Sequence, residues 1–162
     1  MRRGKRQRYS FAMRAVVQRV SRASVTVEGR VTGSIEGGLL VLAGVAADDA
    51  DEDIAWLAGK IVGQKLFPDE SGRMNLSVTE TGGGVLVVSQ FTLLASTRKG
   101  TKPSWHRAAG PESAVLLYER LVRKMEELLG RPVATGQFGA MMEVALINDG
   151  PVTLVLDSRL RE

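Results

Sequence analysis

Apolar and polar residues alternate over much of the chain, a spacing typical of β-strands with one buried face. Two such segments, 14–20 and 23–28, precede a Glu-Gly-Arg turn and a third segment, 31–35, so an antiparallel meander is predicted. The runs 39–45 and 85–94 instead contain many consecutive apolar residues. We expect these two runs in the middle of a sheet, with both faces covered.

Two segments show the three-to-four-residue spacing of an amphipathic helix. The first follows the acidic run 48–53, and one of its faces comprises Ile54, Leu57, Ala58, Ile61 and Lys65. The second, 111–129, is bounded by Gly-Pro at its start and by a glycine at its end. Further strands are predicted at 133–138, 144–147 and 152–156. The predicted fold class is therefore α/β, a single domain in which two principal helices cover a mostly antiparallel, barrel-like β-sheet system.

Length and composition agree with one globular domain. The chain has 162 residues, of which 44% are hydrophobic and 25% charged, values close to those of ordinary folded proteins. It lacks an apolar run of the roughly 18 residues that a membrane-spanning helix needs, so we expect no membrane association and a cytoplasmic location. Cysteine is absent, which excludes disulfides, thiolate nucleophiles and thiolate metal sites.

The acidic run 48–53 has two interpretations. Acidic side chains stabilise the amino-terminal end of a helix, where the helix dipole is positive. They also bind divalent metal ions, but the alternating ligands and the closing glycine of a calcium loop are missing here. We interpret the run as a helix start and predict neither a metal site nor a cofactor.

Basic residues are concentrated at the amino-terminal end. Residues 1–12 contain five basic residues and no acidic one, so of the 22 basic and 18 acidic residues in the chain, 17 basic and 18 acidic residues remain in the rest. Because the rest is not basic overall, any affinity for nucleic acid requires a local patch. We interpret 1–12 as a disordered, dispensable leader before a domain at 13–162. A basic arm that attracts phosphates is the alternative.

Two polar motifs interrupt apolar segments at positions where a ligand could bind. Ser-Gln-Phe-Thr, residues 89–92, ends the second apolar run. A hydroxyl or amide that is buried without a partner costs about 1–3 kcal/mol, so these residues either form cross-strand hydrogen bonds or face a ligand. Asn-Asp-Gly-Pro, residues 148–151, separates two β-branched runs. It is typical of a hairpin turn, or of a loop whose carbonyls meet a ligand.

Five separated motifs share their order and spacing with one known family. They are Met-Arg-Ala-Val-Val-Gln-Arg-Val-Ser-Arg-Ala-Ser-Val at 13–25, Gly-Arg-Met-Asn-Leu at 72–76, Ser-Gln-Phe-Thr-Leu at 89–93, Phe-Gly-Ala-Met-Met at 138–142 and Asn-Asp-Gly-Pro-Val-Thr at 148–153. From residue 13 to about residue 158, the chain resembles the D-aminoacyl-tRNA deacylases, which hydrolyse D-amino acids and glycine from mischarged tRNA. The resemblance implies the same activity, a chiral proofreading step in translation.

The resemblance implies that the motif at 89–92 is the catalytic part of the site. Backbone N–H groups of Phe91 and Thr92, with the Thr92 hydroxyl, would face the ester carbonyl as it becomes an oxyanion, and Ser89 and Gln90 belong to the same segment. The usual thiolate, Ser-His-Asp and zinc-water routes have no evident residues in this chain. The attacking group is then Thr92, or water assisted by the 2′-hydroxyl of the terminal adenosine. We favour water, because no base for Thr92 is apparent.

The resemblance also implies a source of stereospecificity. The peptide bond between Gly150 and Pro151 is expected to be cis, and the dipeptide to enter the active site of the partner subunit in a homodimer. Rigid groups around Cα would exclude every L side chain, so glycine, including glycyl-tRNA mischarged on tRNA(Ala), should be accepted. Arg19 is implied to hold the Gly-Pro carbonyls through its planar guanidinium. The substrate pocket would be lined by Met142, Gly139 and Ala140.

Arg19 and Met142 also have simpler interpretations. An arginine in a strand usually lies on the solvent face. A methionine more often fills space in a hydrophobic core than it contacts a substrate.

The loop 95–109 contains the local basic patch that tRNA binding requires. Positive side chains beside hydroxyls and an aromatic ring suit phosphates and a stacked terminal adenine, and the candidate tRNA contacts are Arg98, Lys99, Lys102, Trp105 and Arg107. A typical deacylase has Arg-Pro-Ser-Phe where this chain has Lys-Pro-Ser-Trp at 102–105, which weakens a bidentate contact there. A merely solvated loop is the alternative. His106, the only histidine, is expected at the surface rather than in catalysis.

Two other function classes fit parts of the sequence. A non-catalytic tRNA-binding module would use the basic loop but would not need the polar residues at 89–92. An esterase or amidase that acts on small D-amino acid derivatives would not need the basic loop.

Overall fold

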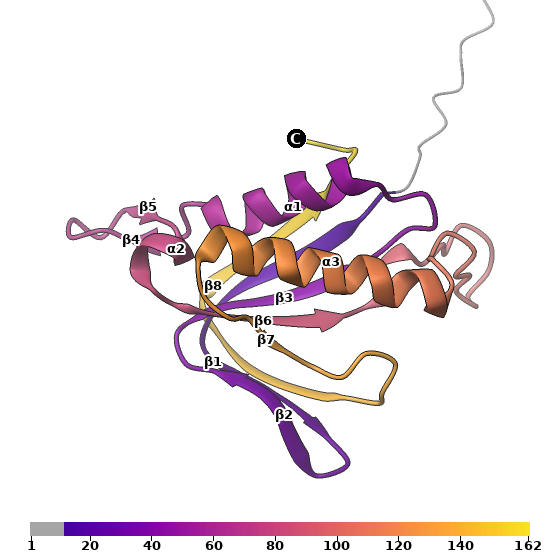
Figure 1. Ribbon diagram of the computed structural model, residues 1–162, viewed down its shortest axis with the longest axis horizontal. Coiled ribbons are helices and arrows are strands. Elements are labelled where there is room, and N and C mark those ends of the chain that lie inside the picture. Colours follow the sequence, from indigo (N-terminus) through magenta and orange to yellow (C-terminus); the bar gives the residue numbers. More distant parts are fainter. Residues whose placement is uncertain (1–11) are drawn as a thin grey trace, which may run out of the picture.

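The structure is a computed structural model that describes residues 12–162. Within this range, a curved β-sheet is covered on one side by two long helices that lie side by side (Figure 1). These are α1 (Asp51–Gly63) and α3 (Pro111–Leu129), which are the two principal helices predicted. The predicted leader lies outside the described residues except for Ala12, which is buried.

The main sheet has six strands in the part of the chain that the structure describes. Their bounds are β1 (Arg14–Val27), β2 (Arg30–Ile35), β3 (Gly38–Gly44), β6 (Gly84–Ser89), β7 (Ala134–Thr135) and β8 (Glu143–Asp157). A small hairpin, β4 (Phe67–Pro68) and β5 (Met74–Leu76), precedes the short helix α2 (Val78–Thr81), and a 3-10 helix, η1 (Phe91–Leu94), follows β6. The strand predicted at 133–138 is thus reduced to the two residues of β7.

Strand β1 organises the sheet because both of its edges are paired. Along one edge, β3 pairs with its first half and β2 with its second half, whereas β8 follows the other edge, all three antiparallel. The pairs β3–β6 and β6–β7 are parallel. Strands β2 and β7 meet at Gly33, where a Cβ would lie 2.3 Å from the carbonyl oxygen of Thr135. The sheet is therefore a nearly closed barrel, and the predicted fold class is confirmed.

Two pairs of predicted strands are single strands in the structure. The segments 14–20 and 23–28 belong to β1, and the segments 144–147 and 152–156 belong to β8. Irregular pairing between β1 and β8 absorbs the polar residues between these segments, as β-bulges do, without ending either strand. The hairpin turn considered for 148–151 is therefore wrong.

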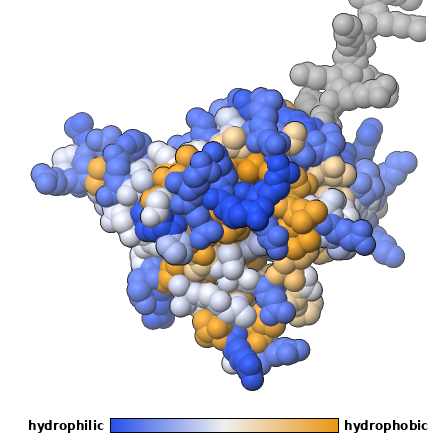
Figure 2. All heavy atoms as spheres, in the orientation of Figure 1, coloured by the Kyte–Doolittle hydropathy of each residue, from blue (hydrophilic) through white to orange (hydrophobic). Residues whose placement is uncertain are grey.

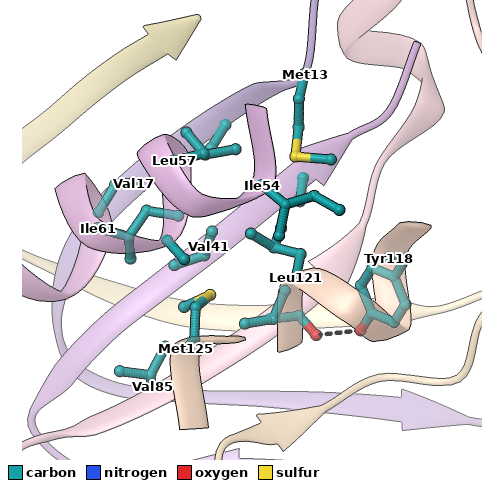
Figure 3. Packing of buried hydrophobic residues seen from close by; sticks show 14 of the residues in the cluster. Met13, Val17, Val41, Ile54, Leu57, Ile61, Val85, Tyr118, Leu121 and Met125 are labelled. Carbon is teal, nitrogen blue, oxygen red and sulfur yellow. Dashed lines mark hydrogen bonds between the residues drawn. The ribbon is translucent and has the colours of Figure 1, made fainter. Parts of the chain in front are cut away.

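The core on the helix side of the sheet is apolar and fixes the positions of β3 and β6 (Figure 3). Its fully buried members include Met13, Val17, Leu39, Val41, Leu57, Ile61, Val87, Leu121 and Met125. Burying each aliphatic side chain contributes about 1.5–3 kcal/mol. Tyr118 of α3 joins this core, and its hydroxyl donates a hydrogen bond to the carbonyl of Val87 at 2.9 Å. Burial raises the pKa of Tyr118 to about 12, so the hydroxyl remains a donor.

A second apolar cluster fills the interior of the barrel. It comprises Val20, Ala23, Val25, Val27, Leu40, Leu86 and Val88. Leu40 of β3 faces this cluster, whereas its neighbours Leu39 and Val41 face the helices. Both faces of β3 are therefore covered, as predicted for the run 39–45.

The helix-covered face of the molecule is mostly polar. In the orientation of Figure 1, hydrophilic residues dominate the surface around the helices, with smaller hydrophobic areas between them (Figure 2). Two of the exposed hydrophobic residues, Leu116 and Leu128, belong to α3. None of the helices formed by residues 12–162 is both long enough and apolar enough to cross a bilayer.

The acidic run before α1 anchors the carboxyl-terminal end of the chain. Asp53 accepts hydrogen bonds from the N–H of Ala50 at 2.9 Å and from the hydroxyl of Ser158 at 2.6 Å. Arg159 forms ion pairs with Asp48 at 2.8 Å and with Asp53 at 3.3 Å. The run is therefore a helix start, as interpreted from the sequence. Residues 12–162 contain no group of three or more His, Asp or Glu side chains placed to hold a metal ion.

Asp49 lies beneath this anchor with a fully buried side chain. It accepts hydrogen bonds from the N–H groups of Met13 at 2.9 Å and Ala46 at 2.6 Å. These bonds and Arg159 favour the carboxylate, but desolvation has the largest effect and, with the negative charge of Asp53, raises the pKa of Asp49 to about 6. The folded protein therefore holds a charge that its surroundings disfavour at neutral pH.

We expect the Asp49 contribution to stability to increase as the pH falls from 7 to 5. The pKa of Asp49 is about 6 in the folded state and 3.8 ordinarily, so between these values the folded state binds more protons than the unfolded state. Over this range the free energy of unfolding should rise by about 1 kcal/mol relative to the Asp49→Asn variant. Urea denaturation of both proteins at both pH values measures this difference, and parallel pH dependences would contradict it.

Candidate active site

The segment predicted to be a catalytic strand end is a tight turn. Strand β6 ends at Ser89, and the N–H of Gln90 donates to the carbonyl of Ala43 in β3 at 2.7 Å. The chain then enters η1, where the N–H of Leu93 donates to the carbonyl of Gln90 at 3.2 Å. Gly44 makes room for this turn, because a Cβ there would lie 2.8 Å from the carbonyl oxygen of Gln90. The strand predicted at 85–94 is therefore wrong beyond β6.

The turn leaves two adjacent N–H groups for a ligand. In a 3-10 helix each N–H donates to the carbonyl three residues earlier, so Phe91 and Thr92, the first residues of η1, have no acceptor within the turn. Both residues are accessible, with Phe91 56% exposed and Thr92 half-buried. Two neighbouring backbone donors of this kind stabilise the negative oxygen that forms when an acyl group is attacked.

The Thr92 hydroxyl is held by its neighbour Gln90. The side-chain Nε2 of Gln90 donates a hydrogen bond to Oγ1 of Thr92, and both side chains are half-buried. This bond is local rather than cross-strand, and it pairs the Gln90 amide with the Thr92 hydroxyl. An amide N–H cannot accept a proton, so the contact orients the hydroxyl without activating it as a nucleophile.

The basic loop is attached beside this turn. Its two sides are joined by reciprocal backbone hydrogen bonds between Ser96 and Ser104, at 2.8 and 2.9 Å. Trp105 follows this bridge, and its ring contacts that of Phe91 edge to face, with ring centroids 5.2 Å apart. Trp105 is 40% exposed and Phe91 56% exposed. The structure therefore brings a predicted catalytic residue and a predicted tRNA contact together as an exposed aromatic pair.

The charged residues of the loop precede and follow Trp105 in the sequence. Arg98, Lys99 and Lys102 are exposed at the tip of the loop, and Arg107 is half-buried at its base. His106 is exposed, as expected, and its Nδ1 lies 2.7 Å from the hydroxyl of Ser104.

Gly150 and Pro151 lie in an excursion of β8 from the β1 ladder. Thr153 pairs with Gln18 and Asn148 with Val20, so residues 149–152 are all opposite Arg19. The peptide bond between Gly150 and Pro151 is cis. Gly150 has φ +137°, and a Cβ there would lie 2.8 Å from the Cγ2 atom of Val152, so glycine is required at this position.

Arg19 fixes the start of this excursion. Its Nε donates to the carbonyl of Asp149 at 3.0 Å, and its Nη1 donates to the carbonyl of Leu66, after α1, at 2.7 Å. The Arg19 side chain is only 13% exposed, so it is not the solvent-facing residue of the simpler interpretation. The hydrogen bonds differ from those implied by the resemblance, because the carbonyl that Arg19 holds in the excursion precedes the Gly-Pro dipeptide.

Asn148 closes the other end of the excursion. Its Oδ1 accepts a hydrogen bond from the N–H of Val152, and its Nδ2 donates to Oγ1 of Thr153, both at 2.9 Å. The sequence alone assigns no separate role to Asn148 or Thr153. The signal that could have found them is the short amide side chain, which commonly bonds to nearby backbone groups in turns.

The segment before β8 positions three further predicted residues. Gly139 is exposed, with φ +78°, in a turn closed by a hydrogen bond from the N–H of Ala140 to the carbonyl of Gln137 at 3.2 Å. Ala140 and Met142 pack against the cluster inside the barrel. A Cβ on Gly136 would lie 2.7 Å from the sulfur of Met142, which shows how closely this side chain packs. In the single chain, Met142 therefore has the core contacts of its simpler interpretation.

The two halves of the site are attached to different parts of β1. Arg14 donates to the carbonyl of Leu93 in η1 at 3.2 Å, whereas Arg19 holds the excursion. Arg19 is five positions after Arg14, or about 17 Å along β1. The turn that contains Thr92 and the excursion that contains Gly150 are therefore held at different positions along β1.

A family model described as D-Tyr-tRNA(Tyr) deacylase matches residues 16–157. The chain belongs to this family. This membership confirms the resemblance that the five sequence motifs indicate. Proteins named D-aminoacyl-tRNA deacylase from Opitutus terrae and Dechloromonas aromatica are 64% and 57% identical to it over 150 residues, which cover 93% of this chain and 100% of each relative.

Two solved structures have a similar fold. A c-Myc DNA unwinding element binding protein is 40% identical, with a TM-score of 0.84 over 88% of this chain and 97% of that chain. A probable eukaryotic D-amino acid tRNA deacylase has a TM-score of 0.77 over 90% and 98% of the two chains. At 18% identity, this second likeness concerns the fold alone.

We expect Arg19→Ala to destabilise the protein by about 2 kcal/mol, because two backbone carbonyls lose a charged donor. The matched control is Arg22→Ala on the same strand, where the side chain is exposed and the change should be within about 0.5 kcal/mol. Urea denaturation measures both values. Equal effects of the two substitutions would show that the hydrogen bonds of Arg19 do not stabilise the fold.

Proposed function

We propose that the protein hydrolyses the ester bond between a D-amino acid and tRNA, releasing the free D-amino acid and tRNA. Family membership and the names of its relatives support a deacylase. The structural observation that carries the proposal is the pair of adjacent N–H groups at Phe91 and Thr92, next to exposed aromatic rings. The reaction removes D-amino acids from mischarged tRNA before the tRNA is used in translation, so we expect the protein in the cytoplasm.

The turn η1 supplies the chemistry. The ester carbonyl oxygen accepts hydrogen bonds from the N–H groups of Phe91 and Thr92, and each such donor contributes about 10²- to 10³-fold to the rate of an acyl transfer. Water adds to the carbonyl carbon, assisted by the free 2′-hydroxyl of the terminal adenosine. The ester C–O bond then breaks, and the ribose oxygen takes the proton. Thr92, held by Gln90, orients the substrate in this scheme.

The basic loop binds the end of the tRNA. Arg98, Lys99 and Lys102 are exposed and suit phosphates, and Arg107 lies at the base of the same loop. The exposed ring of Trp105 offers a surface on which the terminal adenine can stack. Because Trp105 contacts Phe91 at 5.2 Å between ring centroids, an adenine bound there brings the ester to η1.

Stereospecificity comes from the Gly150–Pro151 main chain of a second copy. The excursion is exposed and lies far along β1 from η1 of its own chain, so a homodimer is needed to join the two halves. The outer face of β8 suits such a contact, since Val155 and Ile147 are 75% and 45% exposed. A cleft of about 470 Å³ lies beside this face of β8, and its lining includes Val155 and Leu93.

Rigid main-chain groups near the Cα atom of the substrate amino acid exclude an L side chain without contacting a D side chain. The protein should therefore accept many D-amino acids. Glycine has no side chain to exclude, so glycyl-tRNA mischarged on tRNA(Ala) is also a substrate.

The deciding experiment compares four substrates: D-tyrosyl-tRNA, L-tyrosyl-tRNA, glycyl-tRNA(Ala) and the ethyl ester of D-tyrosine. We expect rapid hydrolysis of the D and glycyl forms, and rates lower by at least about 10²-fold for the L form and the small ester. Binding of all three tRNAs without hydrolysis would indicate a non-catalytic module. Equal rates on the small ester and D-tyrosyl-tRNA would indicate an esterase that does not recognise tRNA.

We expect Thr92→Ala to reduce the rate on D-tyrosyl-tRNA by less than about tenfold, because the backbone donors remain and the hydroxyl is not the nucleophile. Single-turnover kinetics measures this rate, and Thr92→Ser is the control that keeps the hydroxyl. A loss of several orders of magnitude, with an acyl-enzyme trapped in the wild type, would instead assign the attack to Thr92.

A further inference from the structure

We infer that Asn148, together with Thr153, is a positioning residue that sets the stereospecificity of the enzyme by holding the Gly150–Pro151 main chain. The inference rests on the proposed function, because it concerns how the proposed exclusion of L substrates is made rigid. Neither side chain needs to touch the substrate. Their effect is transmitted through the backbone between them.

The side-chain amide of Asn148 bridges the base of the excursion. Its oxygen accepts from the N–H of Val152 and its nitrogen donates to the hydroxyl of Thr153, both at 2.9 Å. The hydroxyl of Thr153 also lies 3.4 Å from Nε2 of Gln18 on β1. One amide group therefore links the last residue before the excursion to the two residues that end it, and β1 supports the link.

The hydrogen bonds of the Asn148 side chain replace the backbone pairing with β1 that the excursion lacks. Residues 149–152 are opposite the single residue Arg19, so they cannot all pair with β1. Proline has no N–H, which leaves Val152 as the first residue after the dipeptide that can donate a backbone hydrogen bond. Asn148 accepts that bond. The excursion is thereby closed by a side chain where regular pairing with β1 is lost.

Arg19 and Asn148 hold opposite ends of the excursion. Arg19 bonds to the carbonyl of Asp149, before the dipeptide, and Asn148 bonds to the N–H of Val152, after it. With Arg19 alone, the dipeptide would be fixed at one end and free to pivot there. Steric exclusion needs groups held to within about 0.5 Å, so both ends must be tied.

Loosening the excursion should affect the two enantiomers differently. The N–H groups proposed to stabilise the oxyanion belong to η1, which Asn148 does not contact. The D substrate therefore keeps its catalytic donors when Asn148 is altered. The L substrate, which is rejected only by the position of the dipeptide, gains access as the dipeptide becomes mobile.

The test compares Asn148→Ala, Asn148→Asp, Thr153→Val and Thr153→Ser in hydrolysis of D- and L-tyrosyl-tRNA. Asn148→Ala should lower the ratio of the D rate to the L rate by about tenfold or more, mainly through a faster L rate. Asn148→Asp should restore the ratio, because a carboxylate accepts from both the Val152 N–H and the Thr153 hydroxyl. Thr153→Val should give a smaller loss, which Thr153→Ser restores.

Amide hydrogen exchange of residues 149–153 provides a readout that does not depend on activity. The Val152 amide should exchange about tenfold faster in Asn148→Ala than in the wild type. The matched control is Thr32→Val, which removes a strand hydroxyl that bonds to the carbonyl of Val25 at 3.4 Å. This control should change neither the exchange at Val152 nor the D to L ratio.

The outcomes separate this inference from the proposed function. Unchanged exchange at Val152 in Asn148→Ala would overturn the positioning role. Faster exchange with an unchanged D to L ratio, or with both rates lowered equally, would overturn the link to stereospecificity. A wild-type protein that does not distinguish D from L substrates would overturn the proposed function, and the exchange data would still decide whether Asn148 holds the excursion.

Discussion

The pairing of β1 along both edges is the constraint on which the rest of the structure depends. Its neighbours β3, β2 and β8 take their registers from it. Its first half contributes Ala15 and Val17 to the core beneath the helices, and its second half contributes Ala23 and Val25 to the core inside the barrel. Buried backbone groups must be hydrogen-bonded, so a neighbouring strand can leave β1 only where other groups replace the lost partners. The excursion at 149–152 meets this condition through one side chain at each end.

The same constraint explains why the proposed catalytic half is a short turn at the end of β6. Ser89 is the last residue of β6 that pairs with β3, and the backbone of Gln90 bonds once more to Ala43 before the chain turns. From there the chain is close to the surface, where the first N–H groups of η1 can remain without a protein acceptor. Arg14 then ties this turn to the carboxyl-terminal end of β8 through Leu93 and Asp157, at 3.2 and 2.9 Å.

Those elements that depend on local spacing could be predicted from the sequence. The second helix has the predicted bounds, and the buried strand at 39–45 has both faces covered. The continuity of β1 and β8 could not be predicted, because a polar interruption has the same pattern whether the chain turns or bulges. The hydrogen bond of Arg19 to Leu66 joins residues 47 positions apart. The pattern of apolar and polar residues along the sequence does not predict such a long-range contact. The predicted residues of the site were found mainly through the family motifs.

In both halves of the site, the groups proposed to contact the reacting centre belong to the main chain. The role of the side chains is therefore to hold these main-chain groups in position. A backbone N–H or carbonyl does not change with the residue that carries it, so its strength as a donor or acceptor depends on where it is held. Gln90, Arg19 and Asn148 each hold a neighbouring group within one chain. In the proposed homodimer, the contact along the outer face of β8 must hold one copy's dipeptide against the other's turn. Stereospecificity then depends on that interface as directly as on the residues of the site, because a shift between the subunits moves the dipeptide by the same amount.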